Sequence, residues 1–81
     1  MKIELIIDEH CFSNDILAEM KCRLAKDFAS AEIITIQYET ESERLRNLSI
    51  RLLPVWLVNG EVLQIDPLNY AELKRKISER M

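Results

Sequence analysis

The chain has very few of the residues that phosphate-binding loops and metal sites require. Its 81 residues include one glycine, one histidine and two cysteines. A single glycine excludes a Walker A loop and a G-x-G-x-x-G turn, because both need several glycines to let the backbone approach phosphate. Two cysteines and one histidine cannot supply the four ligands of a closed structural zinc site. We therefore expect no metal site, and the candidates for reaction chemistry are His10, Cys11 and Cys22.

Charge and hydrophobic runs exclude two further classes of protein. The net charge is −3, so the basic footprint of a nucleic-acid-binding domain is missing. No run approaches the roughly 18 apolar residues of a membrane-spanning helix. The N-terminal apolar run contains Glu4 and Asp8 and lacks the cleavage site of a signal peptide. We expect a cytoplasmic protein that binds neither nucleic acid nor membrane, with residues 1–81 forming one domain.

Hydrophobic periodicity in the first half predicts a strand, a helix and a second strand. The nearly continuous apolar run of residues 3–7 is typical of a strand buried on both faces. From residue 13 onward a helix is expected, because apolar residues recur at spacings of three and four: Leu17, Met20, Leu24 and Phe28. A stripe of small residues runs beside them, and a neighbouring helix is expected to pack on it: Ala18, Cys22, Ala25 and Ala29. The β-branched residues 33–36 predict the second strand.

A capping motif and an apolar segment predict the next two elements. Thr40 and Glu43 have the T-x-x-E spacing of a capping box, which opens a helix. Leu45 and Leu48 are expected to face inward from this short helix. The apolar residues 55–58 predict the third strand.

Turn and capping residues also organise the C-terminal part of the chain. Asn59-Gly60 predicts a two-residue hairpin, from which residues 61–65 return as an antiparallel fourth strand. Asp66 and Pro67 have the pattern of an N-cap followed by a proline at the first helical position. The buried face of this last helix is predicted to include Leu73 and Ile77.

The resulting order, β-α-β-α-β-β-α, restricts the topology. Two right-handed crossovers would make the first three strands parallel neighbours, and the hairpin would add one antiparallel strand. Helices must cover both faces of a sheet whose strands are apolar throughout. The prediction is a three-layer α/β domain with a mixed four-stranded sheet.

One segment in the second half carries a family pattern. Residues 50–54 read I-R-L-L-P and are followed by the apolar strand and by Asn59-Gly60. This segment resembles the I-R-x-x-P, strand, N/D-G signature of the thioredoxin fold, specifically of its small glutaredoxin-like members. Element order, spacing and a cysteine after the first strand extend the resemblance over essentially the whole chain. It implies a thioredoxin-like α/β/α sandwich with Pro54 in cis at the active site, where the Leu53 backbone would pair with bound peptide or glutathione.

The resemblance also implies a position for the reactive group. The family's redox motif, C-x-x-C or C-x-x-S, corresponds here to residues 11–14, which read C-F-S-N. Cys11 takes the position of the attacking cysteine, and Asn14 takes that of the resolving thiol. An amide cannot form a disulfide, so release by a second cysteine is unavailable at this site. Candidate catalytic positions are therefore Cys11 and Asn14, with Leu53 and Pro54 as substrate-binding residues.

The glutathione site of the family is incomplete in this sequence. Glutaredoxins commonly carry a G-G-x-D segment after the hairpin, whereas residues 63–66 read L-Q-I-D. The absent glycine pair argues against glutathione binding in the usual manner. We expect no bound cofactor, and glutathione enters only as a candidate co-substrate.

Three other residues have structural interpretations. Cys22 is eleven residues from Cys11, roughly 16 Å along a helix, whereas a disulfide needs Cα atoms within about 7 Å. Cys22 is therefore interpreted as a small packing residue, and His10 as an exposed loop residue. Trp56 is expected in the core, where its indole N–H needs a hydrogen-bond partner.

Two functions follow from these residues. A helix N-terminus after Cys11 would stabilise its thiolate, while the nearby carboxylates Asp8, Glu9 and Asp15 oppose it. The first hypothesis is monothiol thiol–disulfide exchange through Cys11, a weak oxidoreductase activity on a protein or a low-molecular-weight thiol or disulfide. The second is a redox-inactive, thioredoxin-like protein-interaction or regulatory domain.

Overall fold

The computed structural model describes residues 1–8, 14–40, 42–48 and 53–80. The predicted order of strands and helices is confirmed in these residues, with a 3-10 turn, η1 (Tyr38–Thr40), before the second helix. The strands are β1 (Lys2–Ile7), β2 (Glu32–Gln37), β3 (Val55–Val58) and β4 (Glu61–Val62). The helices are α1 (Asn14–Asp27), α2 (Ser42–Asn47) and α3 (Tyr70–Glu79). Within the described ranges, no helix is both long enough and apolar enough to cross a membrane.

The sheet is mixed and four-stranded, with the order β2-β1-β3-β4. β1 pairs in parallel with β2 and antiparallel with β3, and β3 pairs antiparallel with β4. The expectation of three parallel strands is therefore wrong, because β3 runs against β1. The physical reason lies in where the connection ends. β2 ends opposite Ile7 and β3 begins opposite Ile6, so the chain re-enters the sheet at the end at which it left, whereas a parallel neighbour needs a crossover back to the opposite end.

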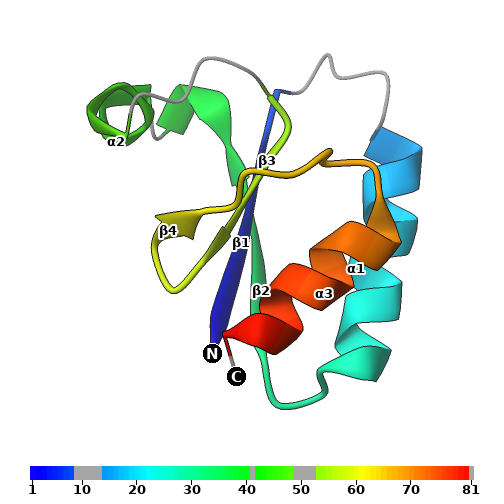
Figure 1. Cartoon of the computed structure of the whole chain (residues 1–81). Helices are drawn as coiled ribbons and strands as arrows, with labels where there is room; N and C mark the ends of the chain where they lie inside the picture. The colour runs from blue at the N-terminus through cyan, green and yellow to red at the C-terminus, as the bar shows by residue number, and fades with distance from the viewer. Residues whose placement is uncertain (9–13, 41, 49–52, 81) are drawn as a thin grey trace.

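The main core lies between the sheet and the two longer helices. Figure 1 shows α1 and α3 on one side of the sheet and α2 on the other, which confirms the three-layer arrangement. The predicted inward stripes of α1 and α3 are buried, together with residues of β1 and β3: Ile3, Leu5, Leu17, Met20, Leu24, Phe28, Trp56, Val58, Leu73 and Ile77. Trp56 is 1% exposed, and its Nε1–H donates to the carbonyl oxygen of Pro67 at 3.0 Å. The expected core position and bonded indole of Trp56 are thus confirmed.

The small-residue stripe of α1 is exposed, so the predicted helix contact on it is wrong. Ala18, Cys22, Ala25 and Ala29 all face solvent. Successive helical residues are rotated by about 100°, which turns this stripe away from the buried one. The sheet and α3 share the core with the other stripe of α1 and leave this one exposed. Cys22 is accordingly an exposed, free thiol, and its interpretation as a packing residue is also wrong.

The predicted capping box before α2 does not form. The Thr40 hydroxyl Oγ1 donates to the carbonyl oxygen of Gln37 at 2.8 Å, within the 3-10 turn that ends at this residue. Because the chain completes this turn first, α2 begins at Ser42. Leu48 follows α2 and is 37% exposed, so its expected inward orientation is wrong.

The start of α3 also differs from the prediction. Asp66 is not the N-cap: its Oδ1 accepts a hydrogen bond from the Leu68 N–H at 3.0 Å in a preceding turn. The N-cap is Asn69, whose side-chain oxygen accepts from the Glu72 N–H at 3.1 Å. The Pro67 carbonyl oxygen accepts a hydrogen bond from the Trp56 indole. Pro67 therefore lies outside α3 and is not its first residue. β4 ends at Val62 instead of residue 65, although the Leu63 N–H still donates to the Trp56 carbonyl oxygen at 3.0 Å.

The hairpin between β3 and β4 has the predicted turn. Asn59 and Gly60 have φ angles of 52° and 84°, the two positive values that a type I′ turn requires. The Asn59 N–H donates to the Lys2 carbonyl oxygen at 2.8 Å, and Asn59 Oδ1 accepts from the Lys2 N–H at 2.9 Å. The turn is thereby bonded to the start of β1.

The second face of the sheet buries a charged pair. Glu4 on β1 is 1% exposed, beside a smaller apolar cluster of Ile6, Val55 and Leu57. Arg44 on α2 donates two hydrogen bonds to the Glu4 carboxylate, from Nη1 to Oε2 at 2.7 Å and from Nη2 to Oε1 at 2.9 Å. The hydrogen bonds from Arg44 hold the pKa of Glu4 below its ordinary value, against the opposing effect of burial. This bidentate pair fastens α2 to the sheet.

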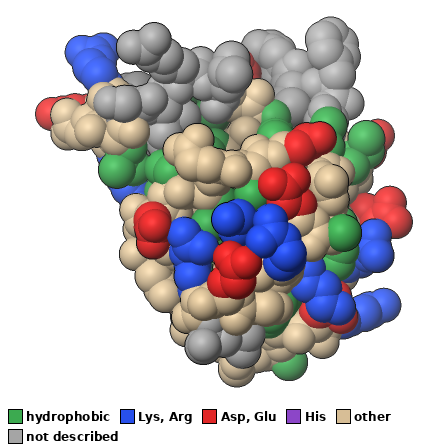
Figure 2. All heavy atoms as spheres, in the orientation of Figure 1, with side chains coloured by type: hydrophobic (Ala, Val, Ile, Leu, Met, Phe, Trp, Pro, Cys, Tyr) green, Lys and Arg blue, Asp and Glu red, His purple; other side chains and the backbone are tan. Residues whose placement is uncertain are grey.

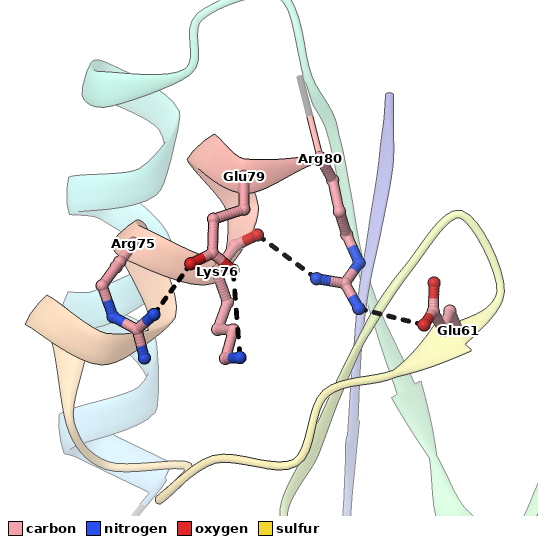
Figure 3. A network of polar contacts seen from close by, with 5 residues as sticks. All are labelled: Glu61, Arg75, Lys76, Glu79 and Arg80. Atoms are coloured by element: carbon pink, nitrogen blue, oxygen red, sulfur yellow. Dashed lines mark hydrogen bonds and ion pairs between the residues drawn. The ribbon is translucent and has the colours of Figure 1, made fainter.

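The C-terminal end of α3 is joined to β4 by arginine. Arg80 donates to Glu61 Oε1 at 3.0 Å and to the Lys76 carbonyl oxygen at 3.4 Å, and Glu79 pairs with Arg75 and Lys76 (Figure 3). Figure 2 shows basic and acidic side chains intermixed over this face of the molecule. Cations near a helix C-terminus also interact favourably with the helix dipole.

The pairing of Glu4 with Arg44 leads to a test by double substitution. Arg44→Met is expected to lower the free energy of unfolding by about 3 kcal/mol, because it leaves a buried carboxylate without its partner. The double variant Glu4→Leu/Arg44→Met is expected to recover most of this loss in urea unfolding. The control Arg75→Met, in an exposed pair, is expected to change stability by less than about 0.5 kcal/mol. A double variant as unstable as Arg44→Met would show that the loss of stability does not come from an unpaired Glu4 carboxylate.

The same pair predicts a difference in acid stability. The pKa of Glu4 lies below 4.5 in the folded protein and near that ordinary value in the unfolded chain, so the unfolded chain binds its proton first as the pH falls. The contribution of Glu4 is therefore fully present above the unfolded pKa and is lost as the pH falls through the folded pKa. The free energy of unfolding, measured as the pH falls through the range between these two pKa values, should decrease more steeply for the native protein than for Glu4→Leu/Arg44→Met. Equal slopes would show that the pair does not control acid stability.

Candidate functional site

Strand register brings two distant segments to one edge of the sheet. Ile6 near the end of β1 lies opposite Val55, the first residue of antiparallel β3. The chain therefore leaves β1 at the same edge at which it enters β3 through Leu53 and Pro54. α1 begins beyond the connection that follows β1, at the same end of the sheet (Figure 1). We call this place the β1–β3 edge.

Leu53 and Pro54 form the described part of this edge. Both are partly buried, and Leu53 packs against the second-face cluster of Ile6, Val55 and Leu57. The Leu53–Pro54 peptide bond is cis, the isomer that the resemblance implies. The two predicted substrate-binding residues thus stand where the chain turns into the sheet.

Of the two predicted catalytic residues, the structure describes Asn14 but not Cys11. Asn14 is the first residue of α1 and is half-buried. Its side-chain oxygen Oδ1 is buried and has no hydrogen-bond partner among the described residues. Cys11 and His10 lie outside the described residues, so the placement of Cys11 against Pro54 stays a prediction. In sequence, Cys11 precedes the first residue of α1 by three positions.

Charges at the start of α1 act in two directions. Asp15 lies in the first turn, where a carboxylate interacts favourably with the exposed N–H groups and the dipole of the helix. The same carboxylate opposes the formation of a nearby thiolate. The start of α1 therefore does not offer a uniformly positive environment to a thiol.

Several apolar side chains are exposed, and two of them, Ile16 and Leu68, were not singled out in the sequence. Ile16, in the first turn of α1, is 50% exposed, Leu68 before α3 is 39% exposed, and Leu48 after α2 is 37% exposed. A signal for Ile16 was available, because it lies outside the buried stripe of α1. Leu68 occupies a connection, where periodicity carries no information, whereas Leu48 was expected to face inward from α2 and follows its last residue.

A polar cluster between α1 and α3 was also missed. Tyr70 donates its hydroxyl hydrogen to Asp27 Oδ2 at 2.5 Å, and Lys74 Nζ lies 3.4 Å from the same oxygen. The Arg23 guanidinium carbon lies 4.2 Å from the centre of the Tyr70 ring. Burial and the hydrogen bond to Asp27 raise the pKa of Tyr70 to about 12, while the bond from Tyr70 lowers the pKa of Asp27. No local pattern predicts a contact between residues 43 positions apart.

Comparison with known proteins gives matches at the level of structure. No protein-family model matches the chain, and no curated protein sequence matches it. The thioredoxin of Fasciola hepatica superposes with a TM-score of 0.75 at 17% identity, over 99% of this chain and 80% of that one. The oxidised thioredoxin of Plasmodium falciparum gives 0.74 at 20% identity, over 98% and 79%. Thioredoxin 1 of Thermosipho africanus gives 0.63 at 18% identity, over 98% and 99%.

These similarities extend over nearly all of the chain, and the sequence identities of these three are 20% or lower. At such identity the similarity concerns the backbone arrangement, and function has to be argued from the site. The superpositions cover 98–99% of this chain, so they include the sheet and the helices on both of its faces. The chain therefore has the thioredoxin fold.

Proposed function

We propose that this protein performs monothiol thiol–disulfide exchange, in a glutaredoxin-like manner, through Cys11. The proposal rests on the strand register at the β1–β3 edge, which brings Leu53 and Pro54, just before β3, beside the end of β1. The chain leaves this edge for α1 through the segment that contains Cys11. The fold of the structural neighbours supports a thiol at this position as the reactive group.

The proposed reaction has two steps. The Cys11 thiolate attacks one sulfur of a disulfide, a bond forms between Cys11 and that sulfur, and the other sulfur leaves as a thiolate that takes up a proton. An external thiolate then attacks the sulfur bonded to Cys11, which regenerates the Cys11 thiolate and forms a new disulfide. The protein has no net change of oxidation state. Asn14 cannot take the place of the external thiol, because its amide forms no bond to sulfur.

The external thiol defines the partners and the compartment that we propose. A low-molecular-weight thiol such as glutathione, or a cysteine of a protein substrate, would complete the second step. Such thiols are kept reduced in the cytoplasm, which we propose as the setting. We assign no resident cofactor to the reaction.

The exposed apolar residues favour a second candidate function. Ile16 is half-exposed in the first turn of α1, next to Asn14 at the position of the resolving thiol. An exposed apolar side chain beside a motif that lacks its resolving cysteine is compatible with a redox-inactive domain that binds a protein partner. This candidate makes the opposite prediction for the Cys11 thiol.

The reactivity of Cys11 is the first test. In a Cys22→Ser background, the pH dependence of alkylation is expected to give Cys11 a pKa below the value of about 8.5 for a free thiol. The background substitution is needed because Cys22 is itself exposed. Incubation with oxidised glutathione is expected to give a mixed disulfide on Cys11 by mass spectrometry.

The matched control is Cys11→Ser, which leaves the exposed Cys22 as a reference thiol in the same protein. We expect Cys22 to form the glutathione adduct several times more slowly than Cys11. Equal rates, or a Cys11 pKa at or above the free value, would favour the interaction domain and reject thiol exchange.

Restoring a second cysteine is the second test. Asn14→Cys in the Cys22→Ser background is expected to form an intrachain disulfide with Cys11 on mild oxidation, because it restores the C-x-x-C spacing of the family's redox motif. The smaller side chain should be tolerated, since no described residue bonds to Asn14 Oδ1. Mass spectrometry under non-reducing conditions detects the loss of two hydrogens. Asn14→Ser is the control, and the formation of intermolecular dimers alone would show that Cys11 does not take the family position.

A further inference from the structure

A shallow groove lies on the surface between α1 and α3, apart from the β1–β3 edge. It has a volume of about 620 Å³ and is lined by Arg23, Lys26, Asp27, Tyr70, Ala71 and Lys74. The α1 residues come from the last two turns of that helix, whereas the β1–β3 edge is next to its first turn. The groove has more room than a single phosphate ion fills, and its volume is within the range of roughly 300–1,000 Å³ of small-molecule sites.

Positive charge is in excess in this groove. Arg23, Lys26 and Lys74 face a single carboxylate, Asp27, in a protein whose net charge is −3. Asp27 already accepts the Tyr70 hydrogen bond and lies 3.4 Å from Lys74 Nζ. Among the described residues, neither Arg23 nor Lys26 has an ion-pair partner. The lining therefore carries two positive charges more than its own carboxylate neutralises.

Contacts within the groove hold two of the cations in place. Arg23 lies over the Tyr70 ring, a cation–π geometry that leaves the edge of the guanidinium able to donate. Tyr70 is held in turn by its bond to Asp27, and Lys74 pairs with the same carboxylate. A ligand that meets side chains already held loses less conformational entropy on binding.

We propose that the groove binds a phosphate group of a small molecule, with Arg23, Lys26 and Lys74 as its ligands. A phosphate group carries nearly two negative charges and three acceptor oxygens at neutral pH. Its charge matches the excess of two positive charges in the groove, and its oxygens can accept hydrogen bonds from the three cationic side chains. A carboxylate would neutralise one of the two charges. The inference is independent of the proposed thiol exchange, because no residue of the groove belongs to that site.

The test is a titration followed by NMR of the ¹⁵N-labelled protein at constant ionic strength. Inorganic phosphate and AMP are the two probes, with chloride replaced as they are added. Saturable shifts are expected at the backbone amides of the lining residues, with a Kd of about 1 mM or lower for one probe or both. Saturation by phosphate assigns the free ion as a ligand, and saturation by AMP alone assigns a phosphate ester.

Two double variants with equal loss of charge separate the groove from general electrostatics. Lys26→Gln/Lys74→Gln is expected to raise the Kd about tenfold, as the loss of two exposed ionic contacts allows. Arg75→Gln/Lys76→Gln removes two cations that pair with Glu79 on α3 outside the groove, and should leave the Kd nearly unchanged.

Three results would overturn the proposal. Shifts that grow linearly without saturation for both probes would show only an ionic-strength effect. Equal weakening by the two double variants would show that overall charge controls binding. Binding unchanged by Lys26→Gln/Lys74→Gln would place the phosphate elsewhere.

Discussion

The position of β1 between two partner strands is the constraint on which the rest of the structure depends. All six of its residues pair with β2, and four of them pair with β3. A strand bonded on both sides leaves only its two faces to be covered, and each face then needs its own layer. Ile3 and Leu5 pack under α1 and α3, while Glu4 and Ile6 face the layer that contains α2. The end of β1 also determines where the candidate redox segment leaves the sheet.

The two faces of β1 are stabilised in different ways. The larger core is apolar, and its burial follows directly from the stripes on α1 and α3. The other face places a carboxylate in the protein interior, where an unpaired charge is strongly unfavourable. Two hydrogen bonds from Arg44 offset that penalty, and such a bidentate pair requires a particular orientation of the guanidinium. The pair consequently gives α2 a defined position that a purely apolar contact would specify less tightly.

The candidate thiol site and the basic groove share one scaffold element. α1 begins at the β1–β3 edge with Asn14 and ends in the groove with Asp27. Its buried stripe packs on the sheet and anchors both ends, while its outer face, with Cys22, stays in solvent. Thiol chemistry at the start of the helix and anion binding near its end would therefore involve separate surfaces. A ligand at one site would not obstruct the other.

Much of the fold was predictable because its signals are local. Periodicity located the buried residues of α1 and α3, and Asn59-Gly60 requires positive φ values that few other pairs adopt. The resemblance carried by residues 50–60 placed Leu53 and Pro54 next to β3 and assigned Cys11 and Asn14 their roles. The bounds of α2 and α3 were less predictable, because Thr40 and Asp66 bond within turns instead of capping the helices.

Long-range contacts account for what local patterns could not predict. The direction of β3 depends on its pairing with β1, and the exposure of Cys22 depends on which face of α1 enters the core. Glu4 with Arg44 and Asp27 with Tyr70 are separated by 40 and 43 positions. Residues so far apart meet only after the sheet and helices have packed. The amino-acid order thus specified the elements and the candidate thiol, while packing set the orientation of β3, the buried charge and the basic groove.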